Sequence, residues 1–94
     1  MSESKTIYSF KLVTGEEIIA EVLSVEADFI YISKPVITIM TENPNNPAQT
    51  NIMFAPWMVS TSLNQMEIKT KFIVYSGESS DEAAASYIEA TKNL

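Results

Sequence analysis

The sequence predicts a mainly β fold, a small and strongly bent barrel of five strands with one helix at its C-terminal end. Three observations predict it. Five stretches rich in apolar, β-branched and aromatic residues are separated by short turn-like segments. Glycine or proline lies within or beside several of these stretches, which is typical of bent strands. The central stretches are apolar on both sides, and a flat sheet with one helix would leave one of these sides uncovered.

The first two strands are expected at about residues 6–13 and 17–25. The stretch "TIYSFKLV" alternates polar and apolar residues, and "TGEE" follows it as a turn. In "EIIAEVLSV" the side chains of Ile18 and Ala20 point to one side and that of Ile19 to the other. Both faces of this strand are therefore expected to be partly covered.

The third and fourth strands are expected at about residues 29–40 and 50–60, and each contains a proline. Pro35 and Pro56 donate no backbone hydrogen bond, so each marks a bulge, a bend or an unpaired edge. The Asn- and Pro-rich "TENPNNPAQT" between the two strands is expected to be an exposed hairpin tip. After the turn "TSLNQ", "MEIKTKFIVYS" is expected to form one bent strand or two short ones over about residues 66–76.

The tail "SSDEAAASYIEATKNL" changes to a helical period. Four of its side chains fall at helical spacing: Ala84, Tyr87, Ile88 and Thr91. Ser79 with Glu82 fits a capping box, and the alanines favour a helix over about residues 80–92. Because so short a helix is marginal alone in water, it is expected to dock on the sheet or on a neighbouring molecule.

The composition fits one domain over residues 1–94, with 46% apolar and 19% charged residues. Cysteine and histidine are absent. Disulfides and the common zinc ligands are therefore excluded, and self-association is the reinforcement left to a small core. The first residues form no apolar targeting segment and no run is long enough to span a bilayer, so a cytoplasmic protein without a membrane partner is expected.

The charge and the residue types argue against two classes of function. Twelve acidic residues and six lysines give a formal net charge of −6, and arginine is absent, which disfavours generic nucleic-acid binding. Lys69 and Lys71 are expected on one face of a strand, most simply as solvated charges. Enzymatic catalysis lacks a cysteine or histidine, and no serine lies in a nucleophile elbow. No catalytic residue, metal ligand or cofactor is predicted.

Two motifs carry a resemblance to a known family. The stretch "LVTGEEIIAEVLSVEADFIYI" resembles the first motif of Sm-like (LSm) proteins, with its glycine at Gly15 and its acidic turn at residues 26–28. The second motif, an apolar pair followed by glycine, corresponds to "FIVYSG" at residues 72–77. In detail the chain is most similar to the short Sm-like proteins carried by marine cyanophages, with "FAPWM" and a helix after "YSGES". The resemblance implies an Sm-like (SH3-like) barrel of phage origin, acting in the host cytoplasm.

The resemblance also implies a non-catalytic protein that forms a homo-oligomeric ring of about five to seven copies. In Sm-like rings the fourth strand of one subunit pairs with the fifth of the next. The apolar fourth strand suits this, because a bare apolar edge invites uncontrolled pairing; the alternative is that Trp57 lies in the core of the monomer. The subunit interface is expected at five residues: Phe54, Trp57, Met58, Phe72 and Val74.

The same resemblance implies a nucleic-acid site at two turns around the ring's pore. Its candidate residues are Asp28, Phe29, Tyr75, Ser76 and Gly77. Bases would stack on the aromatic rings and lysines would bind phosphate; the alternative is that Phe29 and Tyr75 are core residues. The chain departs from RNA-binding Sm proteins, with Ile30 in place of an asparagine and Ser76 in place of a basic residue. An RNA-associated scaffold that binds single-stranded RNA is the first hypothesis. The second is a nucleic-acid-independent module that binds a phage or host protein through the helix face or the ring surface.

Overall fold

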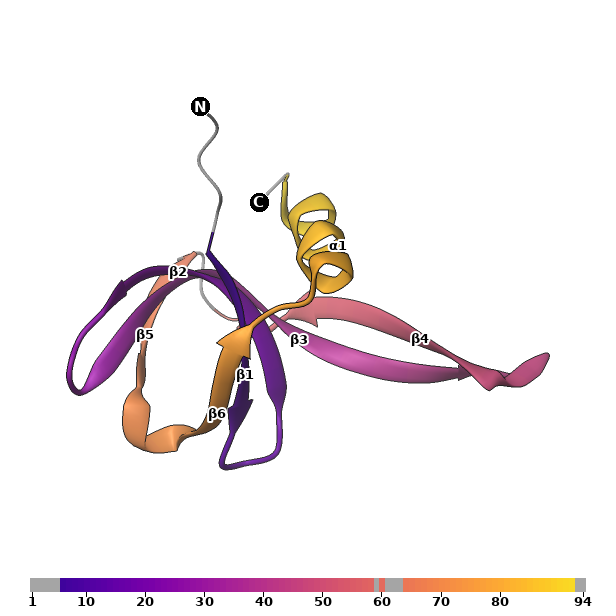
Figure 1. The fold of residues 1–94 in the computed structure, drawn as a ribbon, viewed down its shortest axis with the longest axis horizontal. Coiled ribbons are helices and arrows are strands. Elements are labelled where there is room, and N and C mark those ends of the chain that lie inside the picture. The colour runs from indigo at the N-terminus through magenta and orange to yellow at the C-terminus, as the bar shows by residue number, and fades with distance from the viewer. Residues whose placement is uncertain (1–5, 59, 61–63, 93–94) are drawn as a thin grey trace.

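The structure is a computed structural model that describes residues 6–58, 60 and 64–92. The described residues form one antiparallel sheet, one α-helix and one short 3₁₀ helix (Figure 1). The elements are β1 (Ile7–Leu12), β2 (Glu17–Val25), β3 (Phe29–Asn43), β4 (Asn46–Pro56), β5 (Gln65–Lys69), the 3₁₀ helix η1 (Thr70–Phe72), β6 (Ile73–Glu78) and α1 (Asp81–Thr91). The predicted mainly β class with a C-terminal helix is confirmed.

The long strand β3 organises the sheet because it changes partner along its length. Its first half pairs with β5 and its second half with β4, and the sheet continues from β3 through β2 and β1 to β6. The change falls at Lys34 and Pro35. Lys34 has a positive φ of 52°, and the Pro35 carbonyl accepts a hydrogen bond from the Trp57 N–H at 3.2 Å. The irregularity predicted at Pro35 is confirmed.

The prediction of a small, strongly bent five-stranded barrel differs from the structure in two respects. The described residues form six strands, and their sheet is not closed. Of the two arrangements expected for "MEIKTKFIVYS", the structure has two short strands, because η1 interrupts the stretch. As a result β5 pairs with β3 and β6 pairs with β1, and no pairing joins β5 to β6.

The segment predicted as an exposed, loop-like hairpin tip is mostly strand. The backbone pairing of β3 with β4 continues through Thr41, Glu42 and Asn43, and the turn itself is confined to Pro44 and Asn45. Polar residues suggested a loop, but a two-stranded ribbon needs only backbone hydrogen bonds. The resulting β3–β4 hairpin extends away from the rest of the fold (Figure 1).

Two hydrophobic clusters cover the two faces of β2. The first is enclosed by the curved sheet and consists of Phe10, Leu12, Ile18, Ala20, Ile32 and Ile68. The second lies between the sheet and α1 and consists of Ile7, Ile19, Val36 and Tyr87. Because side chains alternate along a strand, Ile18 and Ala20 enter the first cluster and Ile19 the second. The helix therefore docks on the sheet, one of the two arrangements expected.

The N-cap of α1 lies one residue later than predicted. Its N-cap is Ser80, whose Oγ accepts a hydrogen bond from the Ala83 N–H at 3.2 Å. Ser79 was predicted for this role, but its hydroxyl bonds Ser9 Oγ at 2.7 Å and its N–H donates to the Ile7 carbonyl. These contacts hold Ser79 as a continuation of the β1–β6 pairing, so the capping box predicted with Ser79 is wrong.

Candidate nucleic-acid and subunit interfaces

The turn between β2 and β3 is fastened to the beginning of η1. The Thr70 N–H donates a hydrogen bond to the Asp28 carbonyl at 2.9 Å, and the Glu26 N–H closes the turn on the Phe29 carbonyl at the same distance. The Asp28 side chain is exposed. These bonds bring the acidic turn, which the sequence singled out, beside the end of β5.

A lysine–aromatic cluster, defined as Phe29, Tyr31 and Lys69, lies next to this turn. Phe29 and Tyr31 are two residues apart on β3 and therefore lie on the same face, where their rings meet edge to face with 5.2 Å between centroids. Lys69 is the register partner of Phe29 on β5, and its Nζ lies 5.8 Å from the centre of the Phe29 ring. Lys69 also forms an exposed ion pair with Glu67 at 3.7 Å. Aromatic rings beside an ammonium group are suited to stack on a base and to bind phosphate.

The other half of the predicted nucleic-acid site lies elsewhere. Tyr75, Ser76 and Gly77 belong to β6, where they pair with β1, and not to a turn. The reason is η1, which makes the turn between β5 and β6 several residues earlier. Tyr75 is 68% exposed, which excludes the alternative that it is a core residue. Its ring lies across Gly77, where an added Cβ would be 2.9 Å from the Tyr75 hydroxyl oxygen.

The structure thus brings Lys69 and Thr70 to the acidic turn, where the sequence placed Tyr75, Ser76 and Gly77. The expectation that Lys69 and Lys71 share a strand face is wrong, because Lys71 lies in η1 with its Nζ 5.4 Å from the Phe72 ring centre. The missed signal is the polar "KTK", which interrupts two apolar runs. Phe29 is half-buried against Tyr31 and Lys69, and it belongs to neither hydrophobic cluster of the described residues.

The five predicted interface residues divide into two groups. Phe54 and Trp57 are half-buried and pack inside the subunit, Phe54 against the second cluster and Trp57 against the first. Three are exposed: Met58 by 43%, Phe72 by 48% and Val74 by 65%. Trp57 therefore lies partly in the core of the monomer, as the alternative to an interface role expected. The three exposed side chains can contact another molecule.

The curved sheet is open between β5 and β6, which are not paired with each other, and we call this gap the seam. A pocket of about 320 Å³ at the seam is lined by Leu12, Trp57, Ile68 and Phe72 among others. Glu16 lies at this pocket, and a hydrogen bond from the Thr14 hydroxyl, with a smaller contribution from Trp57, lowers the pKa of its carboxyl group. On either side of the seam, β5 pairs only with β3 and β6 only with β1 among the described strands. The sheet therefore presents two unpaired edges, one along β4 and β5 and one along β6.

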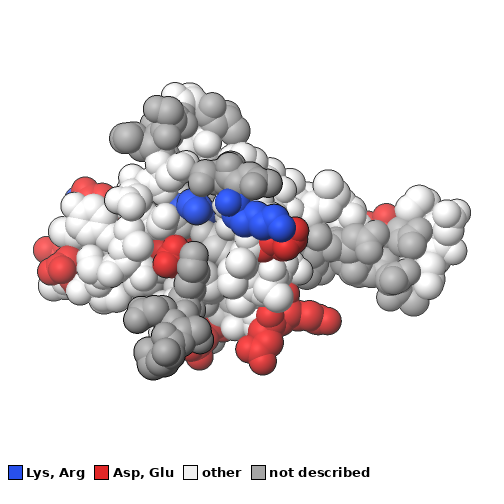
Figure 2. Space-filling view, turned by 90° about the horizontal axis from the view of Figure 1, so that it is seen from above, with Lys and Arg blue, Asp and Glu red and all other residues white. Residues whose placement is uncertain are grey.

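The described residues contain no group of three acidic side chains close enough to hold a metal ion. Among the same residues, no helix is long and apolar enough to cross a membrane. Seen from the side of α1, acidic side chains lie in several separate places and most of the visible lysine atoms gather in one small group (Figure 2). On this side, the described residues thus offer no broad basic surface for a polyanion.

Comparison with known proteins identifies the family. The model of the Sm_like domain matches residues 9–88 of the chain. The comparison with curated proteins finds no match. Sm-like domains are small Sm-fold modules that typically form oligomeric rings and bind RNA, and members of the family are generally non-catalytic. Because the match spans most of the sequence, including both motifs and nearly all of the sheet, this chain belongs to the Sm-like domain family.

Proposed function

We propose that this protein forms a homo-oligomeric ring of about five to seven copies and acts in it as a non-catalytic, RNA-associated scaffold. The observation that carries the proposal is the pair of unpaired edges at opposite ends of one sheet. An exposed edge strand is a template for pairing with another chain. An edge along β6 in one subunit that pairs with the β4–β5 edge of the next makes a head-to-tail contact, the kind of contact from which rings are built when the rotation between subunits closes.

The exposed apolar side chains near these edges support the same contact. Val74 lies on β6 and Phe72 in η1, between the two edge strands, while Met58 follows β4. Fully burying one such side chain contributes about 1.5–3 kcal/mol. A few of them at each subunit boundary would offset much of the cost of association. Native mass spectrometry tests the ring directly, with an expected mass of about five to seven chains; a strict monomer at micromolar concentration contradicts it.

The resemblance to the short Sm-like proteins of cyanophages supports a finer proposal about origin. We infer that the chain is encoded by a phage and works in the cytoplasm of the host cell. A phage or host protein is then an available partner alongside RNA. Finding the coding sequence within a phage genome would support this origin, whereas finding it among chromosomal genes with no phage genes beside it would contradict it.

The lysine–aromatic cluster is the proposed contact for single-stranded RNA, together with the exposed turn at Asp28. Titration with oligo(U) and oligo(A) at about 50 mM salt, where phosphate contacts are strong, is expected to give saturable binding. Phe29→Ala is expected to weaken it by about fivefold or more, because stacking on an aromatic side chain contributes about 1–3 kcal/mol per base. Lys69→Gln removes the adjacent charge and is expected to weaken binding less.

Lys92→Gln is the matched control, because it removes the same charge from the end of α1, far from the cluster in the sequence and on another element. Tyr75→Ala tests the β6 residues independently, since Tyr75, Ser76 and Gly77 share no described contact with Asp28 or Phe29. Equal losses from Lys69→Gln and Lys92→Gln would show that only net charge matters. No binding to either oligonucleotide contradicts the RNA proposal and leaves the ring untouched.

A nucleic-acid-independent role, binding a phage or host protein, is the second candidate function. The net charge of −6 per chain favours it, because a ring multiplies this charge and repels polyanions. A specific groove beside α1, whose charge suits a protein partner and opposes RNA, favours it further.

A further inference from the structure

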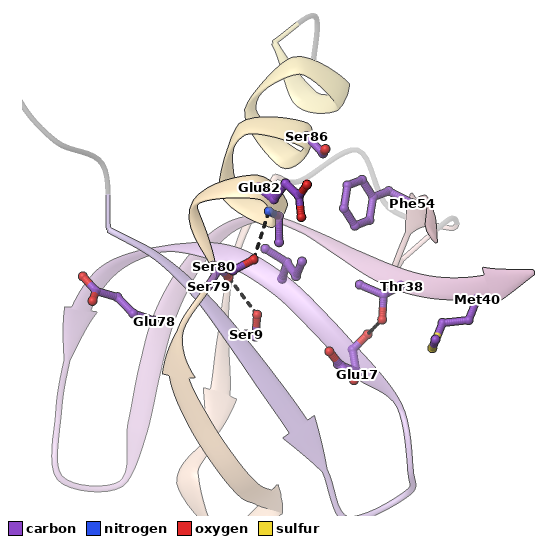
Figure 3. A pocket seen from close by; sticks show the side chains of 12 residues that line it. Ser9, Glu17, Thr38, Met40, Phe54, Glu78, Ser79, Ser80, Glu82 and Ser86 are labelled. Atoms are coloured by element: carbon purple, nitrogen blue, oxygen red, sulfur yellow. Dashed lines mark hydrogen bonds between the residues drawn. The ribbon is translucent and has the colours of Figure 1, made fainter. Parts of the chain in front are cut away.

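A groove of about 520 Å³ lies between α1 and the sheet face that the helix leaves uncovered. One wall comes from α1, with Glu82, Ala83 and Ser86, and the other from the β3–β4 hairpin, with Thr38, Met40 and Phe54. In Figure 3 the Glu82 and Ser86 side chains lie across the groove from Phe54. We call this site the α1 groove.

The α1 groove continues the face of the second hydrophobic cluster. Ile19 and Val36 are register partners on this face and are buried beneath the helix. Glu17, two residues before Ile19 on β2, and Thr38, two residues after Val36 on β3, lie on the same face and are less deeply buried. The helix therefore covers only part of the face, and the uncovered part has an apolar floor of the half-buried Phe54 and the 70% exposed Met40, which adjoins the buried Ile19.

The charges of the α1 groove are of one sign. Glu17 and Glu82 approach it from the sheet and from the helix, and no lysine lies among its lining residues. Within the described part of the chain, neither carboxylate forms an ion pair. Glu78 lines the groove at the end of β6 but points away from its centre in Figure 3.

The hydroxyl groups of the groove are largely occupied by bonds within the protein. Thr38 Oγ1 donates to the Glu17 carbonyl at 3.0 Å, and Ser9 Oγ bonds Ser79 Oγ at 2.7 Å. Ser80 Oγ accepts the capping bond of α1. Recognition in this groove is therefore left mainly to the two carboxylates and the apolar floor.

We propose that the α1 groove binds an extended peptide segment of a partner protein that carries lysine or arginine next to an apolar side chain. The carboxylates attract the cation, and Met40, an adaptable apolar side chain, packs against its apolar neighbour. RNA and anionic membranes do not fit, because their phosphates would meet two carboxylates and no lysine. The inference deepens the second candidate function and depends neither on RNA binding nor on the ring.

The test is a fluorescence anisotropy titration of the whole protein with a labelled six-residue peptide of alternating lysine and leucine. Saturable binding is expected. Glu17→Gln and Glu82→Gln should each weaken it by roughly two- to fivefold, the range of a solvent-accessible ion pair. Met40→Ala should weaken it by about fivefold, because it removes most of an apolar contact. All three side chains are exposed, so these variants are expected to fold.

Each variant has a matched control. Glu26→Gln removes the same charge at the β2–β3 turn, outside the groove. Met53→Ala removes a 56% exposed methionine from the same hairpin, where the register places Met53 opposite Ile39 and so on the other face from Met40. Both controls should leave the affinity unchanged, and a lysine–serine peptide should bind clearly more weakly.

Three outcomes would overturn the α1 groove proposal. They are no binding of the lysine–leucine peptide, equal binding of the lysine–serine peptide, and equal losses from the groove variants and their controls. The last two would show only long-range attraction to an acidic chain. A protein that binds oligo(U) but not the lysine–leucine peptide contradicts the groove alone, so the two proposals fail separately.

Discussion

At the scale of single residues, the Tyr87 hydroxyl fastens α1 to the sheet. It lies 2.9 Å from the Ser33 carbonyl oxygen and 2.8 Å from that of Lys34, and the Tyr87 side chain is 2% exposed. Tyr87→Phe keeps the ring but leaves two carbonyls without this donor. The free energy of unfolding, measured with urea, is expected to fall by about 1–2 kcal/mol. Tyr75→Phe, which removes an exposed hydroxyl, should change it by less than about 0.5 kcal/mol.

The same hydroxyl predicts how stability depends on pH. Burial raises the pKa of Tyr87 to about 12 from its ordinary value of 10.0. The folded chain holds the proton of the Tyr87 hydroxyl more tightly than the unfolded chain. The contribution of this hydroxyl to the free energy of unfolding is therefore complete below pH 10 and is lost as the pH rises towards 12. The urea midpoint should therefore fall over this window more steeply in the native protein than in Tyr87→Phe. If the urea midpoint of both proteins depends on pH in the same way, the Tyr87 hydroxyl is not the group whose pKa is raised.

At the scale of elements, the start of α1 depends on one serine. Ser80→Ala removes the oxygen that accepts from the Ala83 N–H, and the free energy of unfolding should fall by about 1 kcal/mol. Ser86→Ala, an exposed change within the helix, should leave it unchanged or raise it slightly, because alanine favours helices. A loss of helical circular dichroism from Ser86→Ala but not from Ser80→Ala would contradict the cap.

The elements differ in how far the sequence determines them. Alternating apolar residues and an alanine-rich tail were enough to predict a mainly β chain with a C-terminal helix. The split of the last β segment was left open, because "KTK" is compatible with either a strand or a 3₁₀ turn until β5 pairs with β3 and β6 with β1. Likewise, both Ser79 and Ser80 suit an N-cap, and only the bond from Ser79 to Ser9 decides between them.

The candidate nucleic-acid site was also predictable only in part, because part of it depends on contacts between elements that are distant in the sequence. Asp28 and Phe29 follow directly from the turn between two strands. The contact of this turn with Thr70 depends on η1, so the sequence placed Tyr75, Ser76 and Gly77 where Lys69 and Thr70 lie. The α1 groove could not be predicted, because it requires the packing angle of the helix on the sheet, which no local pattern encodes.

At the scale of the whole molecule, the unpaired edges of the sheet and the net charge of −6 act in opposite directions. Edge pairing joins subunits through backbone hydrogen bonds and apolar contacts, whereas like charges on neighbouring subunits repel. The repulsion is screened over about 8–10 Å at physiological salt, and pairing at the edges is not. The proposed ring should therefore persist, and tighten, as salt is raised.

Val74→Lys tests this balance at one edge. Val74 lies on β6 and is 65% exposed, so lysine should fit the folded subunit but place a buried charge at the proposed boundary. We expect native mass spectrometry and sedimentation to show mainly monomers for this variant, with the far-ultraviolet circular dichroism of the parent. Val25→Lys is the matched control, because Val25 is 68% exposed on β2, where it pairs with Ile30 of β3, and β2 forms neither of the two proposed edges; it should leave the ring intact. Rings of unchanged mass from Val74→Lys would show that β6 does not form the boundary, and dissociation by Val25→Lys alone would move it to the β2–β3 turn.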